Sequence, residues 1–242
     1  MRPRAHRRLL ALSDHLPASA SAEASPGHDD GAVVTEMKEL LFEVRSDGVA
    51  TIKLNNPKQL NGVSEAMLNS FHKAIQKVEN PASGIRCLVI TGEGRGFCSG
   101  ANLTSGGGGG ERREPDAFSS VPGQHAAFSL ESKYNPLIMR MRDLRCPIVA
   151  AVNGPCAGVG MSFAMACDMI ICNESAFFLQ AFRNIGLVPD GGATYMLPRL
   201  IGCGRAMEMT MMGERLPAAK ALEWGLVSRI VPNDSLLVPS RR

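Results

Sequence analysis

Residues 148–161 read IVAAVNGPCAGVGM, and residues 88–103 read LVITGEGRGFCSGANL. In both stretches an apolar run typical of a buried strand passes into a glycine-containing turn, after which we expect a helix to start. Glycines that follow a strand let the backbone approach a ligand and point free N–H groups at it. Two such turns that face each other can bind an oxyanion, so these stretches are the first candidate site.

The rest of the chain predicts an α/β fold, because short apolar runs alternate with segments of helical periodicity. Order is expected to begin near Glu39, and Ser46-Asp47-Gly48 is typical of a hairpin turn. A helix is expected to start at the Ser64 cap. The expected strands are residues 41–44, 49–54, 85–91, 148–152 and 169–172, and two further helices are expected at roughly 126–144 and around 161–166.

Composition excludes several classes of protein. The 242 residues are 45% hydrophobic, which excludes a wholly disordered chain. No stretch reaches ~18 uninterrupted apolar residues, so a membrane-spanning helix is not expected. The net charge of +3 is too small to indicate nucleic-acid binding. The glycine spacing matches neither a P-loop nor a dinucleotide fingerprint.

The seven cysteines are odd in number, and no pair has CxxC spacing. Most lie in apolar surroundings, so we expect buried free thiols in a reducing compartment. The five histidines are scattered, and we expect no metal site.

Two segments differ in composition from the rest. Residues 1–36 are rich in Arg, Pro, Ala and Ser, and we interpret them either as a disordered extension or as a targeting peptide, ahead of one domain at 37–242. A cytoplasmic location is expected, with a mitochondrial one as the alternative. Residues 104–122 contain five consecutive glycines, Gly106 to Gly110, and form either a lid or a flexible insertion.

Both glycine-turn stretches resemble the two oxyanion-hole motifs of the crotonase (enoyl-CoA hydratase/isomerase) superfamily. The resemblance extends in order over roughly residues 40–234. Within the superfamily, residues 134–137 (YNPL) and Ala181-Phe182 are most similar to the isomerases that act on a ring epoxide in phenylacetate breakdown. The further matching segments are Leu54-Asn55-Asn56-Pro57 with Asn61, Ala166-Cys167-Asp168-Met169, residues 185–192 (IGLVPDGG) and residues 221–227 (ALEWGLV).

The resemblance implies a spiral of ββα turns that binds an acyl-CoA thioester and needs no separate cofactor, since coenzyme A is part of the substrate. It assigns the oxyanion hole to the backbone N–H groups of Ala101 and Val159. It also implies a homo-oligomer, a trimer or hexamer, if the C-terminus permits, because members of the superfamily continue for several further helices beyond the point that corresponds to Arg242. The residues expected to line the substrate are Gly100, Asn102, Leu103, Gly158 and Gly160.

The acid–base groups distinguish the reactions of this superfamily. Its hydratases use two glutamates, and this chain has Ser162 and Phe182 at those positions. Its isomerases place an acid where this chain has Asp190, which we expect Leu187 and Val188 to desolvate. The alternative for Asp190 is a cap of the helix that begins near Gly191. The favoured prediction is an isomerase, with a hydratase-type lyase or a catalytically silent acyl-CoA-binding protein as alternatives.

Overall fold

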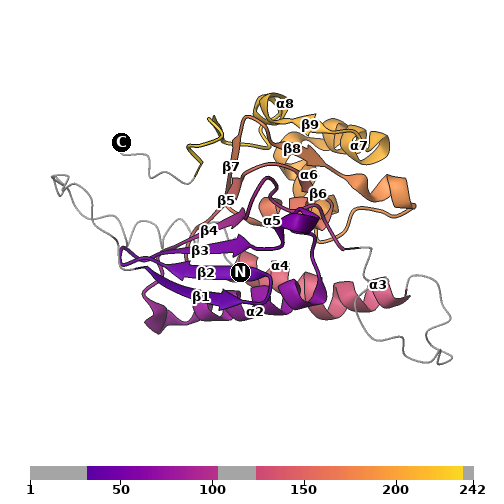
Figure 1. The fold of residues 1–242 in the computed structure, drawn as a ribbon. Coiled ribbons are helices and arrows are strands. Elements are labelled where there is room, and N and C mark those ends of the chain that lie inside the picture. The colour runs from indigo at the N-terminus through magenta and orange to yellow at the C-terminus, as the bar shows by residue number, and fades with distance from the viewer. Residues whose placement is uncertain (1–31, 103–123, 237–242) are drawn as a thin grey trace, which may run out of the picture.

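The computed structural model describes residues 32–102 and 124–236. Its main sheet has seven strands in the order β1-β2-β3-β4-β5-β7-β10 (Figure 1). The first three strands are antiparallel neighbours, and β3, β4, β5, β7 and β10 are parallel. The bounds are β1 (Val33–Met37), β2 (Leu40–Val44), β3 (Val49–Leu54), β4 (Cys87–Gly92), β5 (Ile148–Val152), β7 (Met169–Asn173) and β10 (Arg229–Val231).

A second, smaller sheet has the order β6-β8-β9. Its strands are β6 (Cys156–Ala157), β8 (Phe177–Leu179) and β9 (Leu216–Pro217). The late elements of the chain, α7, β9 and α8, lie together at the orange-to-yellow end of the molecule (Figure 1). The helices are α2 (Glu65–Glu79), α3 (Gln124–Ser129), α4 (Asn135–Asp143), α5 (Val159–Ala166), α6 (Ala193–Ile201), α7 (Cys203–Met212) and α8 (Ala218–Glu223). The single turns are η1 (Pro57–Gln59), η2 (Pro81–Ser83), the π turn η3 (Leu130–Tyr134) and η4 (Ala181–Ile185).

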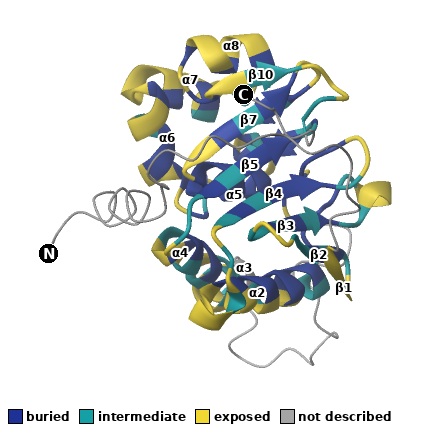
Figure 2. Ribbon diagram, turned by 90° about the vertical axis from the view of Figure 1, so that its left-hand side faces the viewer, coloured by how far each residue is buried: buried dark blue, intermediate teal, exposed yellow. Residues whose placement is uncertain are grey.

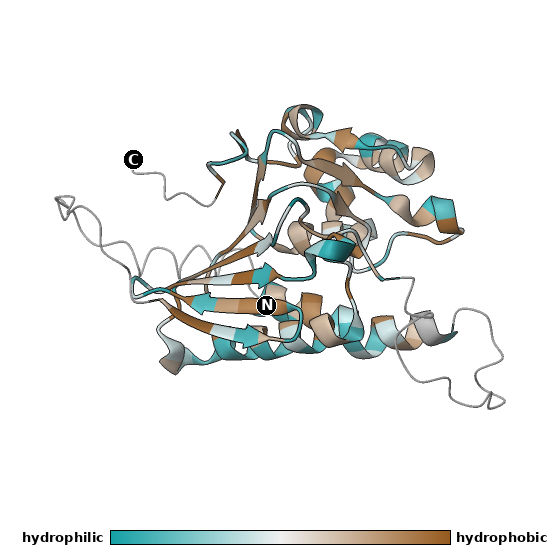
Figure 3. Cartoon of the chain, viewed as in Figure 1, coloured by the Kyte–Doolittle hydropathy of each residue, from teal (hydrophilic) through white to brown (hydrophobic). Residues whose placement is uncertain are grey.

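Helix α2 begins where the sequence predicts, because the Ser64 hydroxyl accepts a hydrogen bond of 3.1 Å from the Met67 N–H. Its apolar face packs under the sheet, and its outward side is mostly hydrophilic (Figure 3). The Phe71 ring meets the Phe163 ring of α5 edge to face, with centroids 5.3 Å apart. This contact ties α2 to the helix that follows the second glycine turn.

Helix α5 lies inside the molecule, and all eight of its residues are buried. The strands beside it, β4, β5 and β7, are largely buried as well (Figure 2). A helix that is apolar on every side, with a run such as VGMSFAMA, is stable only in such a core. The start of α5 is therefore rigidly placed by packing around it.

Two expectations from the sequence need correction. Order does not begin near Glu39, because β1 starts at Val33 and pairs with β2 over its whole length. The domain boundary expected after residue 36 thus falls inside β1. Because β1 is an edge strand with Val33 and Val34 exposed, it lacks the buried alternation that marks β3. Leu103, the loop 104–122 and most of the N-terminal extension lie outside the described residues.

Four cysteines, Cys98, Cys156, Cys167 and Cys172, are buried thiols, as expected, and Cys203 is exposed. Within residues 32–102 and 124–236, no group of His, Cys, Asp and Glu is arranged to bind a metal ion. In the same ranges, no helix is both long and apolar enough to cross a bilayer.

Candidate active site

The two glycine turns lie directly against each other. A Cβ atom on Gly100 would stand 3.8 Å from the Cα atom of Gly158 and 3.2 Å from the Ala157 carbonyl oxygen. Both glycines have a positive φ, 103° and 52°, which a larger residue would adopt only with strain. The Ala157 N–H also donates a 2.9 Å hydrogen bond to the Cys98 carbonyl. The predicted meeting of the two turns is therefore present.

The N–H of Ala101 points away from the segment that supports it. Val63 is bridged to Ala101, and the two hydrogen bonds of this bridge use the Gly100 carbonyl (2.8 Å) and the Asn102 N–H (3.1 Å). In a parallel bridge the central residue turns its own N–H to the other side. The Ala101 N–H donates no hydrogen bond to any described residue.

Val159 is the first residue of α5, and its N–H also lacks an acceptor among the described residues. The Gly158 N–H just before it donates to the Leu179 carbonyl, and the Met161 N–H two residues later donates to the Gly158 carbonyl. A free N–H at a helix N-terminus carries partial positive charge along the helix axis. Ala101 and Val159 therefore present two donors on two adjoining turns.

Gly160 has a packing role in this arrangement. A Cβ atom there would lie 2.6 Å from the Cβ atom of Cys98, so only glycine lets α5 approach the first turn this closely. Its expected contact with the substrate, like those of Gly100, Asn102 and Gly158, stays a prediction.

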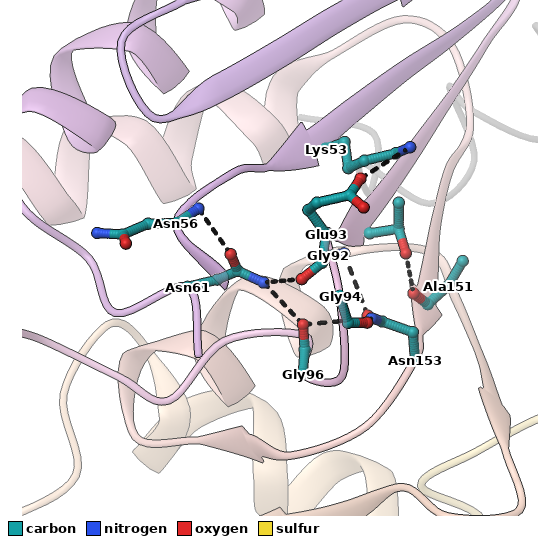
Figure 4. A network of polar contacts seen from close by, with 10 residues as sticks. Lys53, Asn56, Asn61, Gly92, Glu93, Gly94, Gly96, Ala151 and Asn153 are labelled. Atoms are coloured by element: carbon teal, nitrogen blue, oxygen red, sulfur yellow. Dashed lines mark hydrogen bonds and ion pairs between the residues drawn. The ribbon is translucent and has the colours of Figure 1, made fainter. Parts of the chain in front are cut away.

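The Asn61 side chain stabilises the turn that precedes Ala101 through hydrogen bonds (Figure 4). The Asn61 side chain is fully buried, and its Nδ2 atom donates to the carbonyls of Glu93 (3.0 Å) and Gly96 (2.7 Å). Its Oδ1 atom accepts from the Asn56 N–H at 2.8 Å. Asn61 has φ 56°, a left-handed conformation that asparagine tolerates better than most residues. The motif that carries Asn61 thus has a structural function.

Asn153, which no sequence pattern singles out, holds the same turn from the end of the neighbouring strand β5. The Nδ2 atom of Asn153 donates to Gly94 (2.8 Å) and Gly96 (3.2 Å), and its Oδ1 accepts from the Gly92 N–H (3.2 Å), as Figure 4 shows. Asn153 directly follows β5, so it joins the carboxyl ends of β4 and β5. Both asparagines together fix residues 92–96, from which the chain leads to Ala101.

Asp190 lies in a turn between η4 and α6, and its Oδ1 atom is buried with no hydrogen-bond partner among the described residues. Burial raises the pKa of its carboxyl group to about 6. The backbone carbonyl of Asp190 accepts from the Ser162 hydroxyl (3.0 Å) and from the Ala193 N–H (2.9 Å). Helix α6 has Gly192 at its N-cap and no side-chain cap, so the interpretation of Asp190 as a capping residue is wrong.

The cause expected for this burial is wrong as well. Leu187 is 51% exposed and Val188 is 78% exposed, so neither covers Asp190. The turn instead packs against two helices. A Cβ atom on Gly191 would stand 2.9 Å from the Ser162 Cβ of α5 and 3.0 Å from the Ile138 Cδ1 of α4. Helices α4 and α5, both distant in sequence, therefore contact the turn that contains Asp190.

Comparison with known proteins agrees with this geometry. The enoyl-CoA hydratase/isomerase family matches residues 44–241. This chain belongs to that family. It is 38% identical to the 1,2-epoxyphenylacetyl-CoA isomerase of Escherichia coli (strain K12), over 83% of this chain and 72% of that protein. It is 37% identical to a probable enoyl-CoA hydratase of Rhodobacter capsulatus, over 78% of this chain and 67% of that protein.

Solved structures of the enoyl-CoA hydratase/isomerase family share the fold. The crystal structure of an enoyl-CoA hydratase from Mycobacterium avium subsp. paratuberculosis has a TM-score of 0.69 at 36% identity, covering 83% of this chain and 71% of that one. A monofunctional enoyl-CoA isomerase from M. smegmatis has a TM-score of 0.64 at 32% identity, and the match covers 82% of this chain and 79% of that one. The fold is thus the crotonase fold, and both reaction types occur among its relatives.

Two residues stand where the resemblance places the hydratase glutamates of this family. Ser162 is fully buried, and its hydroxyl is already used by the Asp190 carbonyl. Phe182 is 7% exposed, and its ring lies 3.9 Å from a Cβ atom placed on Gly158. The wall beside the second glycine turn is therefore aromatic and apolar.

Tyr134 is a further residue to which the sequence assigns no role. Burial raises the pKa of its hydroxyl to about 12, and the charges of Cys98 and Asp190 add to this effect. Tyr134 is partly buried and packs against the hydrophobic core. The YNPL segment contains it, but periodicity alone does not indicate which way a tyrosine before Pro136 points.

Proposed function

We propose that this protein is an isomerase of acyl-CoA thioesters, which shifts a double bond or opens a ring epoxide next to the thioester. The backbone N–H groups of Ala101 and Val159 bind the thioester oxygen, and Asp190 transfers the proton. The observation that carries the proposal is the buried, unpartnered Oδ1 atom of Asp190, in a turn bonded to the same helix that presents the Val159 N–H.

The proton transfer uses one carboxylate. With a 3-enoyl-CoA, the Asp190 carboxylate removes a proton from C2, and the electron pair moves into the thioester carbonyl to form an enolate. The enolate collapses to the 2-enoyl product as Asp190 returns the proton to C4, so the composition does not change. Each preorganised N–H donor at the developing oxyanion is worth about 3 kcal/mol in the transition state.

The ionisation of Asp190 suits this role. A carboxyl group with a pKa of about 6 is mostly ionised at neutral pH and can accept a proton. It is also a far stronger base than an ordinary surface aspartate, because burial disfavours its charged form. The same group can thus take a proton from one carbon and give it to another.

The surroundings of Asp190 disfavour the addition of water to an enoyl-CoA. Addition of water needs a second acid–base group that activates the water, and Ser162 and Phe182 occupy the positions of both hydratase glutamates. The Ser162 hydroxyl is engaged with the Asp190 carbonyl, and the Phe182 ring is apolar. We therefore favour isomerisation over the hydratase-type alternative.

The test incubates the full chain with 3-hexenoyl-CoA and with 2-hexenoyl-CoA and follows the products by mass. Isomerisation leaves the mass of the ester unchanged, whereas hydration adds one water. We expect the first reaction to dominate, with loss of activity in Asp190→Asn. Formation of 3-hydroxyhexanoyl-CoA at a comparable rate would contradict the proposal, and binding of both esters without turnover would support the silent acyl-CoA-binding alternative.

A further inference from the structure

We propose that Gln59 is a positioning residue for the first oxyanion donor, because it holds Ser99 and Asn102 on either side of the peptide that carries the Ala101 N–H. This inference rests on the proposed function, in which that N–H binds the thioester oxygen. It gives the segment ahead of α2, residues 56–63, a part in the chemistry of the site.

Gln59 contacts the first glycine turn with both its backbone and its side chain. Its carbonyl oxygen accepts a hydrogen bond of 3.1 Å from the Ser99 hydroxyl. Its side-chain Oε1 atom accepts one of 2.6 Å from the Asn102 Nδ2 atom. Ser99 and Asn102 flank the peptide between Gly100 and Ala101, so a single residue holds both sides of the proposed donor.

The backbone on both sides follows the same arrangement. The Leu60 carbonyl accepts a 2.9 Å hydrogen bond from the Ser99 N–H, and Val63 is bridged to Ala101. These bonds do not use the Ala101 N–H. The direction of that N–H therefore depends on how residues 59–63 lie against residues 99–102.

The chain reverses after Gln59 through two consecutive left-handed residues. Leu60 has φ 49° and Asn61 has φ 56°, and leucine rarely adopts this conformation. Such backbone persists only where the surrounding contacts determine it strongly, and it gathers at sites that hold a ligand or a reacting group. The reversal brings the Gln59 carbonyl back within reach of Ser99.

Gly62 leaves the room that these contacts need. A Cβ atom on Gly62 would stand 3.3 Å from the Gln59 carbonyl oxygen and 3.3 Å from the Ser99 Oγ atom. A side chain there would therefore crowd the hydrogen bond between Gln59 and Ser99. The close approach of the two segments depends on glycine at this position.

The Gln59 side chain is itself held in place. The Asn56 Nδ2 atom donates to the same Oε1 atom at 3.3 Å, and an amide oxygen has lone pairs for two donors. Asn56 also bonds to the buried Asn61 through its backbone N–H. The Oε1 atom is thus fixed in position for Asn102, although Gln59 is exposed.

The first measurement follows enolate formation and needs no turnover. Bound at two preorganised N–H donors, 3-oxohexanoyl-CoA should ionise to its enolate at a lower pH than in water, which its ultraviolet absorbance reports. Gln59→Ala removes the bond to Asn102 and should raise the midpoint of this ionisation by about 0.7 pH unit, the effect of one hydrogen bond. The affinity for saturated hexanoyl-CoA, which forms no enolate at these pH values, should stay nearly unchanged.

Two further variants separate positioning from general loosening of the fold. Gln59→Glu keeps an oxygen that accepts from both asparagine amides, so we expect it to restore the midpoint. Gln76→Ala replaces an exposed glutamine on α2 and is the matched control, which should equal wild type. Ser99→Ala removes the bond on the other side of the peptide and should raise the midpoint in the same direction.

The second measurement is the isomerisation of 3-hexenoyl-CoA. We expect Gln59→Ala to lower kcat about 5-fold with KM nearly unchanged, because the donor acts on the enolate more than on the bound ester. In the double variant with Asn102→Ala, kcat should be no lower than in Asn102→Ala alone, since both changes break the same bond. Fully additive effects would overturn the proposal.

The two proposals fail separately. An unchanged midpoint in Gln59→Ala overturns the role of Gln59, even if wild type isomerises 3-hexenoyl-CoA. A raised midpoint in Gln59→Ala that Gln59→Glu restores supports that role even if 3-hexenoyl-CoA is not turned over, in which case the proposed reaction fails. Binding of 3-oxohexanoyl-CoA to wild type without any enolate overturns the inference, because no oxyanion donor is then present to be positioned.

Discussion

The Ser162 hydroxyl donates a 3.0 Å hydrogen bond to the backbone carbonyl of Asp190, a residue 28 positions further along the chain. Ser162 belongs to α5, which presents the Val159 N–H, and Asp190 belongs to the turn before α6. One bond thus links the helix that carries the proposed oxyanion donor to the turn that carries the proposed base. Where the resemblance places a hydratase glutamate, this chain has Ser162. The Ser162 hydroxyl holds the turn that carries another acid, Asp190.

Ser162→Ala removes this link. The Asp190 carbonyl retains its bond from the Ala193 N–H, so the fold should lose only about 1 kcal/mol of stability. Because the turn becomes free to shift, we expect kcat to fall several-fold while KM changes little. Steady-state kinetics and a urea titration measure the two effects. Unchanged kcat would show that the bond has no part in placing Asp190.

Asp190→Asn preserves the shape of the side chain but cannot accept the proton. We expect turnover to fall about 10²–10⁴-fold with little change in the affinity for a CoA ester. Since Asp190 does not cap α6, the fold should tolerate the change. Calorimetric binding and rate measurements on the same preparation separate the two quantities. A variant with nearly full turnover would exclude Asp190 as the proton carrier.

The pKa of Asp190 also predicts how stability depends on pH. It rises from an ordinary 3.8 to about 6 on folding, so the folded state binds this proton more tightly than the unfolded state. The ionised group therefore destabilises the fold progressively as pH rises from about 4 to 6. We expect Asp190→Asn to melt at a higher temperature than wild type at pH 7, with the difference vanishing near pH 4. A difference that is independent of pH would refute this account.

Val159→Pro deletes one oxyanion donor. Val159 is the first residue of α5, a position that proline tolerates because its N–H has no partner within the helix. We expect a loss of about 10²-fold or more in turnover, comparable to the loss of other oxyanion donors. Circular dichroism must confirm the helix content. A folded variant with normal turnover would remove Val159 from the site.

Deletion of residues 1–36 removes most of β1. That strand pairs with β2 along Val33–Met37, and its loss would expose the β2 edge. We expect the truncated chain to melt several degrees lower than wild type, because it loses the pairing of β1 with β2. Differential scanning calorimetry decides the point, and an unchanged melting temperature would show that β1 adds no stability.

The local pattern of the sequence was sufficient to predict the two glycine turns. Their strands are continuous apolar runs, and Gly100 and Gly158 stand where the backbone needs a positive φ, a requirement that acts within a few residues. The start of α2 at Ser64 and the position of β5 also depend on residues close together in the chain, so both could be predicted to the residue. Asp190 was identified through the resemblance, since a single aspartate in a turn is also typical of a helix cap.

Tertiary structure alone decided what surrounds Asp190. Its neighbours in sequence, Leu187 and Val188, are exposed, whereas the adjoining Gly191 packs against α4 and α5. The hydrogen bonds from the Asn153 side chain to the carbonyls of Gly94 and Gly96 likewise join segments far apart in the chain. A sequence pattern records the periodicity of one element at a time, whereas desolvation and hydrogen bonding depend on which elements pack together in space. The chemistry of Asp190 is therefore a property of the packed core and not of the turn that contains it.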